Sequence, residues 1–329
     1  MTPEISAFTP AMIQAARKRI SPWVRRTPLV YSAALSRRTG VEVYLKMECW
    51  QRYGCFKVRG VASFLSAAGE EALSRGLVTA SSGNHGLALA GLAREWGRGP
   101  ARVYVPETAD KAKLKRLQSA QAEIHIGGSD FYAAFDRAQA DVLKTDAAFV
   151  HSHADPLVIA GQGTIGLEIL EDLPDADAIV APIGGGGLIS GIATAAAHIS
   201  EKATVIGAEP MAAPGAWQSL KAGHPVERVD LKPSLADGLQ GGLSPLPFSI
   251  VHPLVRQVAL VSEKEILMAV QALFHEEQLI IEGAASVGLA ALLGGNLELP
   301  GPKVVLVLTG RNVAGDRFLE LMARDSETL

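Results

Sequence analysis

Apolar residues follow two alternating spacings along the whole chain. Short apolar runs such as 77–80, 177–183 and 304–309 have the length of buried strands. The longer stretches between such runs repeat apolar residues every three or four positions, as amphipathic helices do. Strands that alternate with helices are typical of an α/β fold with mostly parallel sheets.

This pattern divides the chain into a series of expected elements. We predict strands at 41–46, 77–80, 102–106, 123–126, 177–183, 204–209, 255–261 and 304–309. We predict helices at 10–19, 57–68, 86–96, 111–119, 131–143, 159–170 and 188–199, two more within 264–293, and a short one at the end. Glycine and proline are frequent at 225–247, so we expect an irregular, site-lining segment there.

The length of the chain favours more than one domain. With 329 residues it can bury two hydrophobic cores. We expect residues 1–47 and 148–329 to form a large domain and residues 48–147 a small inserted α/β domain. No change of composition marks either boundary.

Composition and charge exclude several classes of partner. The formal net charge is −3 and basic residues occur only in short patches, which argues against nucleic-acid binding. Apolar runs are too short to cross a membrane, and the N-terminus lacks the apolar core of a signal peptide. Only Cys49 and Cys55 are present, which fits a reducing cytoplasm, and we expect a cytoplasmic protein.

One lysine is placed where a reactive amine is useful. Lys57 lies between the turn at Gly54 and an apolar helix. Removal from bulk water favours the neutral amine, which can attack a carbonyl group. Most lysines at helix starts are solvated surface residues, so Lys57 gains its meaning only together with two loops elsewhere in the chain.

The first of these loops is a run of four glycines between a buried strand and a helix: Gly184, Gly185, Gly186 and Gly187. Successive N–H groups and the helix N-terminus can hold a phosphate there, because no side chain blocks its approach. A dinucleotide site is the rival interpretation, with Glu209 on a ribose. Its third glycine is replaced by Ser190, and it leaves Lys57 unexplained.

The second loop, Ser81–Gly86, offers hydroxyl, amide and N–H groups at a helix start. It suits a carboxylate or a ring oxygen, although helix capping by Ser82 or Asn84 is the simpler interpretation of the loop alone. Thr309 follows the last strand, where its hydroxyl can bond a ring nitrogen or serve only a turn. Lys57 and the two loops together indicate a phosphate-bearing carbonyl cofactor, pyridoxal 5'-phosphate.

Three further polar residues are less informative. His151 and His153 would share one face of a strand, but only Asp155 lies near them, so we interpret them as structural or loop histidines. Glu282 precedes a predicted helix and either caps it or supports the site.

The ordered set of motifs resembles the serine/threonine dehydratase and serine racemase family of pyridoxal-phosphate enzymes, the fold type II group that includes tryptophan synthase β. The segments that carry the resemblance are Arg26–Leu29, Leu45–Glu48, Phe56–Gly60, Ser81–Gly86, Ile159–Gly166, Gly184–Gly187, Gly207–Pro210 and Ala236–Gly238. The resemblance implies two open, mostly parallel twisted-sheet domains with the cofactor between them, and a homodimer.

The resemblance also implies roles for individual residues. The cofactor would be held by Lys57 as a Schiff base, by Phe56 beside the ring, by Asn84 at the phenolic oxygen, by Gly184–Gly187 at the phosphate and by Thr309 at the pyridine nitrogen. The substrate carboxylate would be received by Ser81, Asn84 and His85. Lys57 would take the α-proton, and Ser82 would stand on the opposite face, where racemases place a second acid/base.

The activity implied is removal of water and ammonia from a β-hydroxy amino acid such as L-threonine or L-serine, which gives a 2-oxo acid. Alternatives are an amino-acid racemase, a hydroxyaspartate dehydratase and, more remotely, a non-catalytic amino-acid-binding protein. Gly241 replaces a serine that contacts substrate in racemases, which weakens that alternative.

Several other positions depart from the family pattern. Tyr53 and Cys55 replace a threonine and a serine before the lysine, and Arg311 replaces a glycine after the last strand. The family's cation site pairs a glutamate, here Glu209, with an aspartate whose place Gly215 takes. We therefore expect no metal, with Glu209 as the one residue that could still bind a cation.

Overall fold

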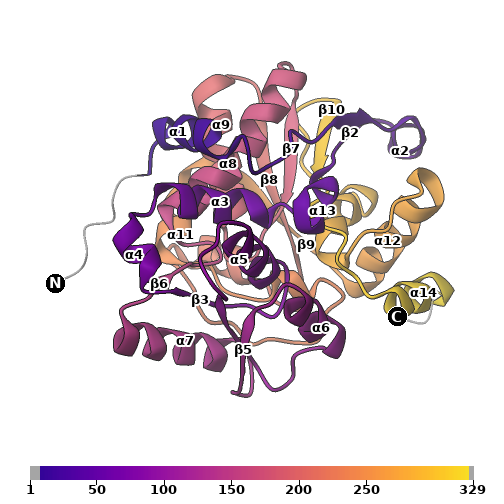
Figure 1. The fold of residues 1–329 in the computed structure, drawn as a ribbon. Coiled ribbons are helices and arrows are strands. Elements are labelled where there is room, and N and C mark those ends of the chain that lie inside the picture. Colours follow the sequence, from indigo (N-terminus) through magenta and orange to yellow (C-terminus); the bar gives the residue numbers. More distant parts are fainter. Residues whose placement is uncertain (1–7, 326–329) are drawn as a thin grey trace.

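Parallel strands form two sheets in the computed structural model, which describes residues 8–325 (Figure 1). The six-stranded sheet contains, in spatial order, β1 (Leu29–Tyr31), β2 (Glu42–Lys46), β10 (Lys303–Val307), β7 (Ala178–Pro182), β8 (Thr204–Pro210) and β9 (Val255–Val261). The four-stranded sheet contains β5 (Glu123–Ile126), β4 (Arg102–Val105), β3 (Leu77–Ala80) and β6 (Ala148–Phe149). Strand β1 runs antiparallel to β2, and the other neighbours are parallel.

Helices connect and cover these strands. They are α1 (Pro10–Ile20), α2 (Ala33–Thr39), α3 (Lys57–Ala67), α4 (Glu70–Ser74), α5 (Asn84–Glu95), α6 (Lys111–Ser119), α7 (Phe131–Thr145), α8 (Pro156–Asp172), α9 (Gly187–Ile199), α10 (Gly215–Ala222), α11 (Pro245–Leu254), α12 (Glu263–Glu277), α13 (Gly283–Leu293) and α14 (Gly315–Ala323). Short 3₁₀ turns occupy Glu48–Trp50, Arg52–Gly54 and Asp237–Leu239. The α/β class with two mostly parallel sheets is confirmed.

The large sheet is buried on both faces, as its continuous apolar strands require. In β10, Val304 and Leu306 pack in one core with residues of α12 and α13. Val305 and Val307, which point the other way, pack in a second core with α8 and α9. The alternation fixes the register of the strand, because a slip by one residue would exchange the two faces.

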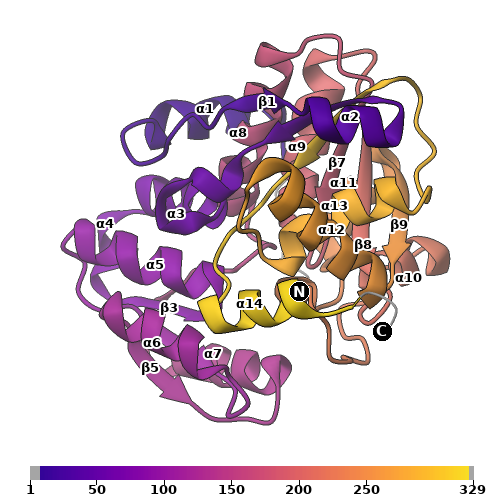
Figure 2. The ribbon, with the colours of Figure 1, turned by 90° about the vertical axis from the view of Figure 1, so that its right-hand side faces the viewer.

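Helix α3, which begins at Lys57, joins the two sheets (Figure 2). It packs against α8 on one side and α5 on the other. The crossing with α8 is close: a Cβ on Gly60 would lie 2.5 Å from Gln162 Nε2, and one on Gly161 would lie 2.3 Å from the carbonyl oxygen of Arg59. Glycine at both positions lets the backbones approach, so the position of Lys57 is tied to the large sheet.

The structure corrects several expected boundaries. Strands β1 and β6 and helices α2, α4 and α10 were absent from the prediction, because each is too short to show a clear period. Helix α11 was also absent, because its three prolines are more typical of a loop. The irregular segment ends at Ser244 instead of residue 247, because Pro245 occupies the first turn of α11. Strand β6 pairs with β3, so we propose that the small domain extends to at least Phe149.

Within residues 8–325, none of the helices is both long and apolar enough to cross a bilayer.

Candidate active site

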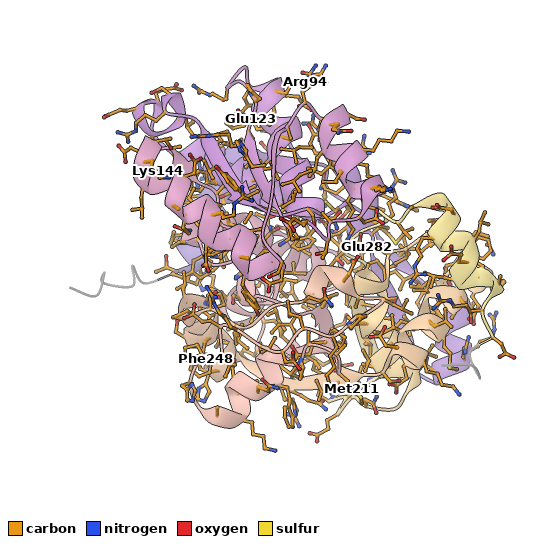
Figure 3. The ribbon with its side chains drawn as sticks, turned by 90° about the horizontal axis from the view of Figure 1, so that it is seen from below. Arg94, Glu123, Lys144, Met211, Phe248 and Glu282 are labelled. Atoms are coloured by element: carbon orange, nitrogen blue, oxygen red, sulfur yellow. The ribbon has the colours of Figure 1, made fainter. Side chains whose placement is uncertain are left out.

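Loops at the carboxyl ends of three parallel strands surround one cavity of about 1080 Å³. Ser81 follows β3, Gly184 follows β7 and Thr309 follows β10, and all three residues line the cavity. Ligands of parallel sheets bind at such strand ends. Glu282 also lines the cavity. In Figure 3 it lies between two groups of elements, one with Glu123 and Lys144 and the other with Met211 and Phe248. The cavity therefore lies between the two sheets.

Lys57 presents its amine to this cavity. Its Nζ donates a hydrogen bond of 2.8 Å to the carbonyl oxygen of Ser152 and lies 5.1 Å from the ring centroid of Phe56. Burial lowers the pKa of the amine to about 8. At neutral pH a usable fraction of the amine is therefore unprotonated, as the predicted reaction with a carbonyl group requires.

A buried charge network anchors the helix that carries Lys57. The Arg59 guanidinium binds the Glu48 carboxylate at 2.8 Å and the Glu168 carboxylate at 2.7 Å. Lys46 Nζ lies 2.6 Å from Glu168 as well. Arg59, Lys46 and Glu48 are fully buried, and their charges compensate one another away from water. The network joins α3 to α8 and β2, so it holds the start of α3 against both the neighbouring helix and the large sheet.

The Ser81–Gly86 loop does not cap its helix with a side chain. Helix α5 has Gly83 at its N-cap, and neither Ser82 nor Asn84 caps it, so the capping interpretation is wrong. The Asn84 amide is engaged elsewhere: Nδ2 donates to Glu282 Oε1 at 2.7 Å, and Oδ1 accepts from Asn312 Nδ2 at 2.7 Å. The first backbone N–H groups of α5 and the second N–H of the Asn84 amide are available for an anion or a phenolic oxygen.

His85 lines the cavity, but its side chain is directed elsewhere. The ring is buried, and Nε2 lies 2.9 Å from the carbonyl oxygen of Val150, which requires a proton on Nε2. Burial lowers the pKa of His85 to about 3, so the ring is neutral and Nδ1 is an acceptor. A neutral acceptor does not bind a carboxylate, so we propose that His85 contributes its backbone N–H instead.

The glycine loop has the form of an anion cradle. Gly186 has φ +88°, a left-handed conformation that favours glycine, and it forms the N-cap of α9 without a side-chain hydrogen bond. A Cβ on Gly185 would lie 2.3 Å from His153 Cγ, and one on Gly187 would lie 2.6 Å from the His153 carbonyl oxygen. The glycines therefore serve two purposes: they expose N–H groups and they admit the His153 segment.

His151 and His153, predicted as structural or loop histidines on one strand face, lie in the loop after β6 and form part of the cavity wall. The strand-face placement is wrong, because β6 ends at Phe149. His151 Nδ1 accepts hydrogen bonds from the backbone N–H groups of His153 and Ala154 at 3.2 and 3.0 Å. Burial lowers the pKa of His151 to about 4, and burial also lowers that of His153. Both rings are neutral and bracket Ser152, the partner of Lys57. In the described part of the chain, histidine, cysteine and acidic residues do not gather into a metal site.

Glu282 occupies the N-cap position of α13, but its side chain makes no capping hydrogen bond and accepts one from Asn84 instead. Its carboxyl group is half-buried, and burial raises its pKa to about 7. Thr309 is buried at the same end of the cavity, and its carbonyl oxygen accepts a hydrogen bond of 3.0 Å from Phe56 N. This bond ties the loop before Lys57 to the end of β10.

The departures from the family pattern lie mostly outside the cavity. The Tyr53 hydroxyl donates to Glu95, and Arg311 is exposed and does not line the cavity. Glu209 is buried and accepts the N–H groups of Ala216 and Trp217 at 3.0 and 2.7 Å. Its carboxylate caps α10 and is not free for a ribose, so the dinucleotide interpretation does not fit.

Comparison with known proteins decides between the remaining interpretations. Residues 20–310 match the model of a family described as pyridoxal-phosphate dependent enzymes. The chain belongs to this family. Its cofactor is pyridoxal 5'-phosphate, as the lysine and the two loops predicted.

Three individual proteins show which members of the family this chain resembles. An L-threonine ammonia-lyase of Thermotoga maritima is 41% identical over 302 residues, which cover 92% of this chain and 75% of that protein. A beta-hydroxyaspartate dehydratase of Paracoccus denitrificans is 36% identical over a region that covers 92% of this chain and 96% of that protein. The solved structure of maize serine racemase superposes with a TM-score of 0.90 at 32% identity, over 96% and 97% of the two chains. The resemblance to the dehydratase and racemase family, and the prediction of a pyridoxal-phosphate-dependent lyase, are confirmed.

The residues present fit this cofactor. A glycine-capped helix terminus suits its phosphate, and the amine of Lys57 suits its aldehyde. The Asn84 amide can bond its phenolic oxygen, and the Thr309 hydroxyl can bond its pyridine nitrogen. All of these groups line the same cavity.

Proposed function

We propose that this enzyme is an ammonia-lyase that converts a β-hydroxy amino acid, with L-threonine and L-serine as the first candidates, into a 2-oxo acid and ammonia. One observation carries the proposal: the half-buried amine of Lys57 shares a cavity with a glycine anion cradle and a polar loop. The L-threonine ammonia-lyase relative supports the choice of reaction.

The residues that line the cavity have separate roles in cofactor binding. Gly184–Gly187 and the start of α9 bind the phosphate, and Thr309 donates its hydroxyl hydrogen bond to the ring nitrogen. Asn84 holds the phenolic oxygen, with its amide oriented by Glu282. When bound, pyridoxal phosphate supplies a sink for the electron pair left at Cα. A hydroxyl at the ring nitrogen makes that sink weaker than a carboxylate would, which favours elimination over transamination.

Lys57 then acts as the general base. Ser81 and the first N–H groups of α5 receive the substrate carboxylate, which places Cα–H near the neutral amine. Lys57 removes the α-proton, the Cβ–O bond breaks, and the hydroxyl leaves as water after it gains a proton. Hydrolysis of the resulting enamine consumes one water and releases ammonia, so the net products are a 2-oxo acid and ammonia.

A racemase is the second candidate. Ser82 lines the same cavity as Lys57, and the fold matches that of maize serine racemase. Inversion needs a second acid/base on the face opposite Lys57, and Ser82 is the residue for it. If Ser82→Ala abolishes inversion of L-serine and spares its elimination, both activities belong to this enzyme. Loss of elimination alone would assign Ser82 to the lyase reaction.

We also propose a cytoplasmic homodimer. The two cysteines, Cys49 and Cys55, are buried and unpaired, which suits a reducing compartment. The dimer is an expectation from the family resemblance, and light scattering of the purified holoenzyme tests it: a mass near one chain contradicts the dimer.

The direct test of the function is 2-oxo acid release. Purified enzyme with pyridoxal phosphate is incubated with L-threonine or L-serine, and 2-oxo acid and ammonia are measured together. Equal amounts of both products support the proposal, and loss of both in Lys57→Ala assigns the base. Ammonia without 2-oxo acid, or unchanged activity in Lys57→Ala, contradicts it.

A further inference from the structure

An aromatic surface lines part of the cavity and has no role in the chemistry described so far. Phe131 and Phe135 lie four residues apart on α7, so their rings project from the same side of the helix. Their centroids are 6.1 Å apart, and both line the cavity that contains Lys57. Both side chains are half-buried: they pack against the core of the small sheet, and part of each lines the cavity.

This surface continues toward the reactive lysine. The Phe135 centroid lies 5.5 Å from that of His151, and the His151 ring lies 4.4 Å from the His153 ring. Ser152, between the two histidines, accepts the hydrogen bond from Lys57 Nζ. Both imidazoles are neutral because they are buried, so an uncharged ring surface connects α7 with the position of the base.

The cations on the cavity wall are poorly placed for a second substrate carboxylate. Lys113 forms an ion pair with Asp237 at 2.5 Å, and Arg228 forms one with Asp136 at 2.7 Å. Lys232 is exposed to solvent. Among the described residues of the wall, Lys57 is the only half-buried cation without an ion pair, and it is the base. A dicarboxylate would therefore leave a charge poorly compensated.

We propose that the preferred substrate is a β-hydroxy amino acid whose β-substituent is an aromatic ring, seated against Phe131 and Phe135. The inference rests on the elimination activity proposed above and names its substrate class. A ring in this place makes offset or edge contacts with the two phenylalanines, which an alanine-sized group does not reach.

The chemistry balances without an added reactant. For 3-phenylserine, the Cα–H and Cβ–O bonds break, and the enamine that remains takes up one water, so the products are phenylpyruvate and ammonia. No atom is oxidised or reduced by a second substrate.

The test compares four substrates on the holoenzyme: L-serine, L-threonine, L-threo-3-phenylserine and L-threo-3-hydroxyaspartate. We expect kcat/KM for phenylserine to exceed that for threonine by about tenfold or more, a typical gain from one filled apolar pocket. Phe131→Ala should lower the ratio of phenylserine to serine kcat/KM by about tenfold. Leu143→Ala, on the same helix but 88% exposed, is the matched control and should leave the ratio unchanged.

Any other result contradicts a specific part of this proposal. A preference for serine or threonine, or a ratio that Phe131→Ala does not change, contradicts the aromatic substrate class and leaves the elimination activity standing. Preference for hydroxyaspartate that Lys232→Ala abolishes assigns a dicarboxylate instead. If none of the four yields a 2-oxo acid while the cofactor is bound, the elimination activity itself fails. Should Phe131→Ala not fold, the wild-type ranking alone decides.

Discussion

The side-chain amide of Asn84 donates a hydrogen bond of 2.7 Å to the Glu282 carboxylate across 198 residues of sequence. Asn312 donates to the oxygen of the same amide, so both ends of the amide are fixed. This arrangement leaves one Asn84 N–H to face the cavity. Glu282 therefore acts as a positioning residue for a group that the cofactor would contact.

The hydrogen bond between Asn84 and Glu282 gives the first prediction. Glu282→Ala should lower kcat/KM by about 10- to 100-fold, because loss of a hydrogen bond to a charged group costs about 1.5–3 kcal/mol. Glu282→Gln keeps an oxygen that can accept from Asn84, so it should retain most of the activity. The absorbance maximum of the bound cofactor should shift in Glu282→Ala and not in the exposed control Glu298→Ala. Wild-type kcat/KM and spectrum in Glu282→Ala would contradict this role.

The lowered pKa of Lys57 predicts how cofactor uptake depends on pH. Only the neutral amine reacts with an aldehyde, so the rate of uptake by the cofactor-free protein should rise about tenfold per pH unit below pH 8. Above pH 8 it should level off. The rate is followed by visible absorbance after mixing. A rate that keeps rising to pH 10 would show an ordinary, solvated lysine.

The Arg59 network predicts a large effect on stability. Arg59→Ala leaves the carboxylates of Glu48 and Glu168 buried and undercompensated, which costs about 3–5 kcal/mol. Arg317→Ala, which breaks an exposed pair with Glu320 on α14, should cost less than about 1 kcal/mol. Denaturant unfolding of the cofactor-free proteins measures both. Similar losses for the two variants would argue against the network as the anchor of α3.

The contact between Gly185 and His153 predicts a defect in cofactor binding. In Gly185→Ala the added Cβ meets the His153 ring at 2.3 Å, so the loop or the ring must move and the anion cradle is distorted. We expect the affinity for pyridoxal phosphate to fall at least about tenfold, an effect of about 1.4 kcal/mol. Gly315→Ala, whose Cβ meets open space, is the control. Equal affinities, measured by titration of the cofactor-free proteins, would contradict the account.

Local sequence was sufficient for the elements with a clear period. Strand β3 and helix α6 begin and end where the pattern placed them, and Lys57 lies at the predicted helix start. Each of these features depends on neighbouring residues, such as the glycine turn before the lysine. The cavity-lining role of the segment after residue 225 was also visible, because glycine and proline mark a loop directly.

Long-range contacts were not accessible in the same way. The placement of His153 against Gly185 depends on the packing of a loop after β6 onto the end of β7. The interpretation of Asn84 as a cap failed because its amide meets Glu282 and Asn312, which lie beyond any local window. One signal was available in the sequence. Glu282 directly precedes a predicted helix, and Asn312 closely follows the last predicted strand, where the site was expected.

The central claim is that Lys57 carries the cofactor, and borohydride reduction of the holoenzyme tests it most directly. Reduction should fix the cofactor on the tryptic peptide 53–59, because trypsin cleaves after Arg52 and Arg59 but not at a modified Lys57. Lys57→Ala should yield no labelled peptide. A label on the peptides of Lys113 or Lys232, the other lysines of the cavity wall, or a protein that takes up no cofactor, would contradict the account.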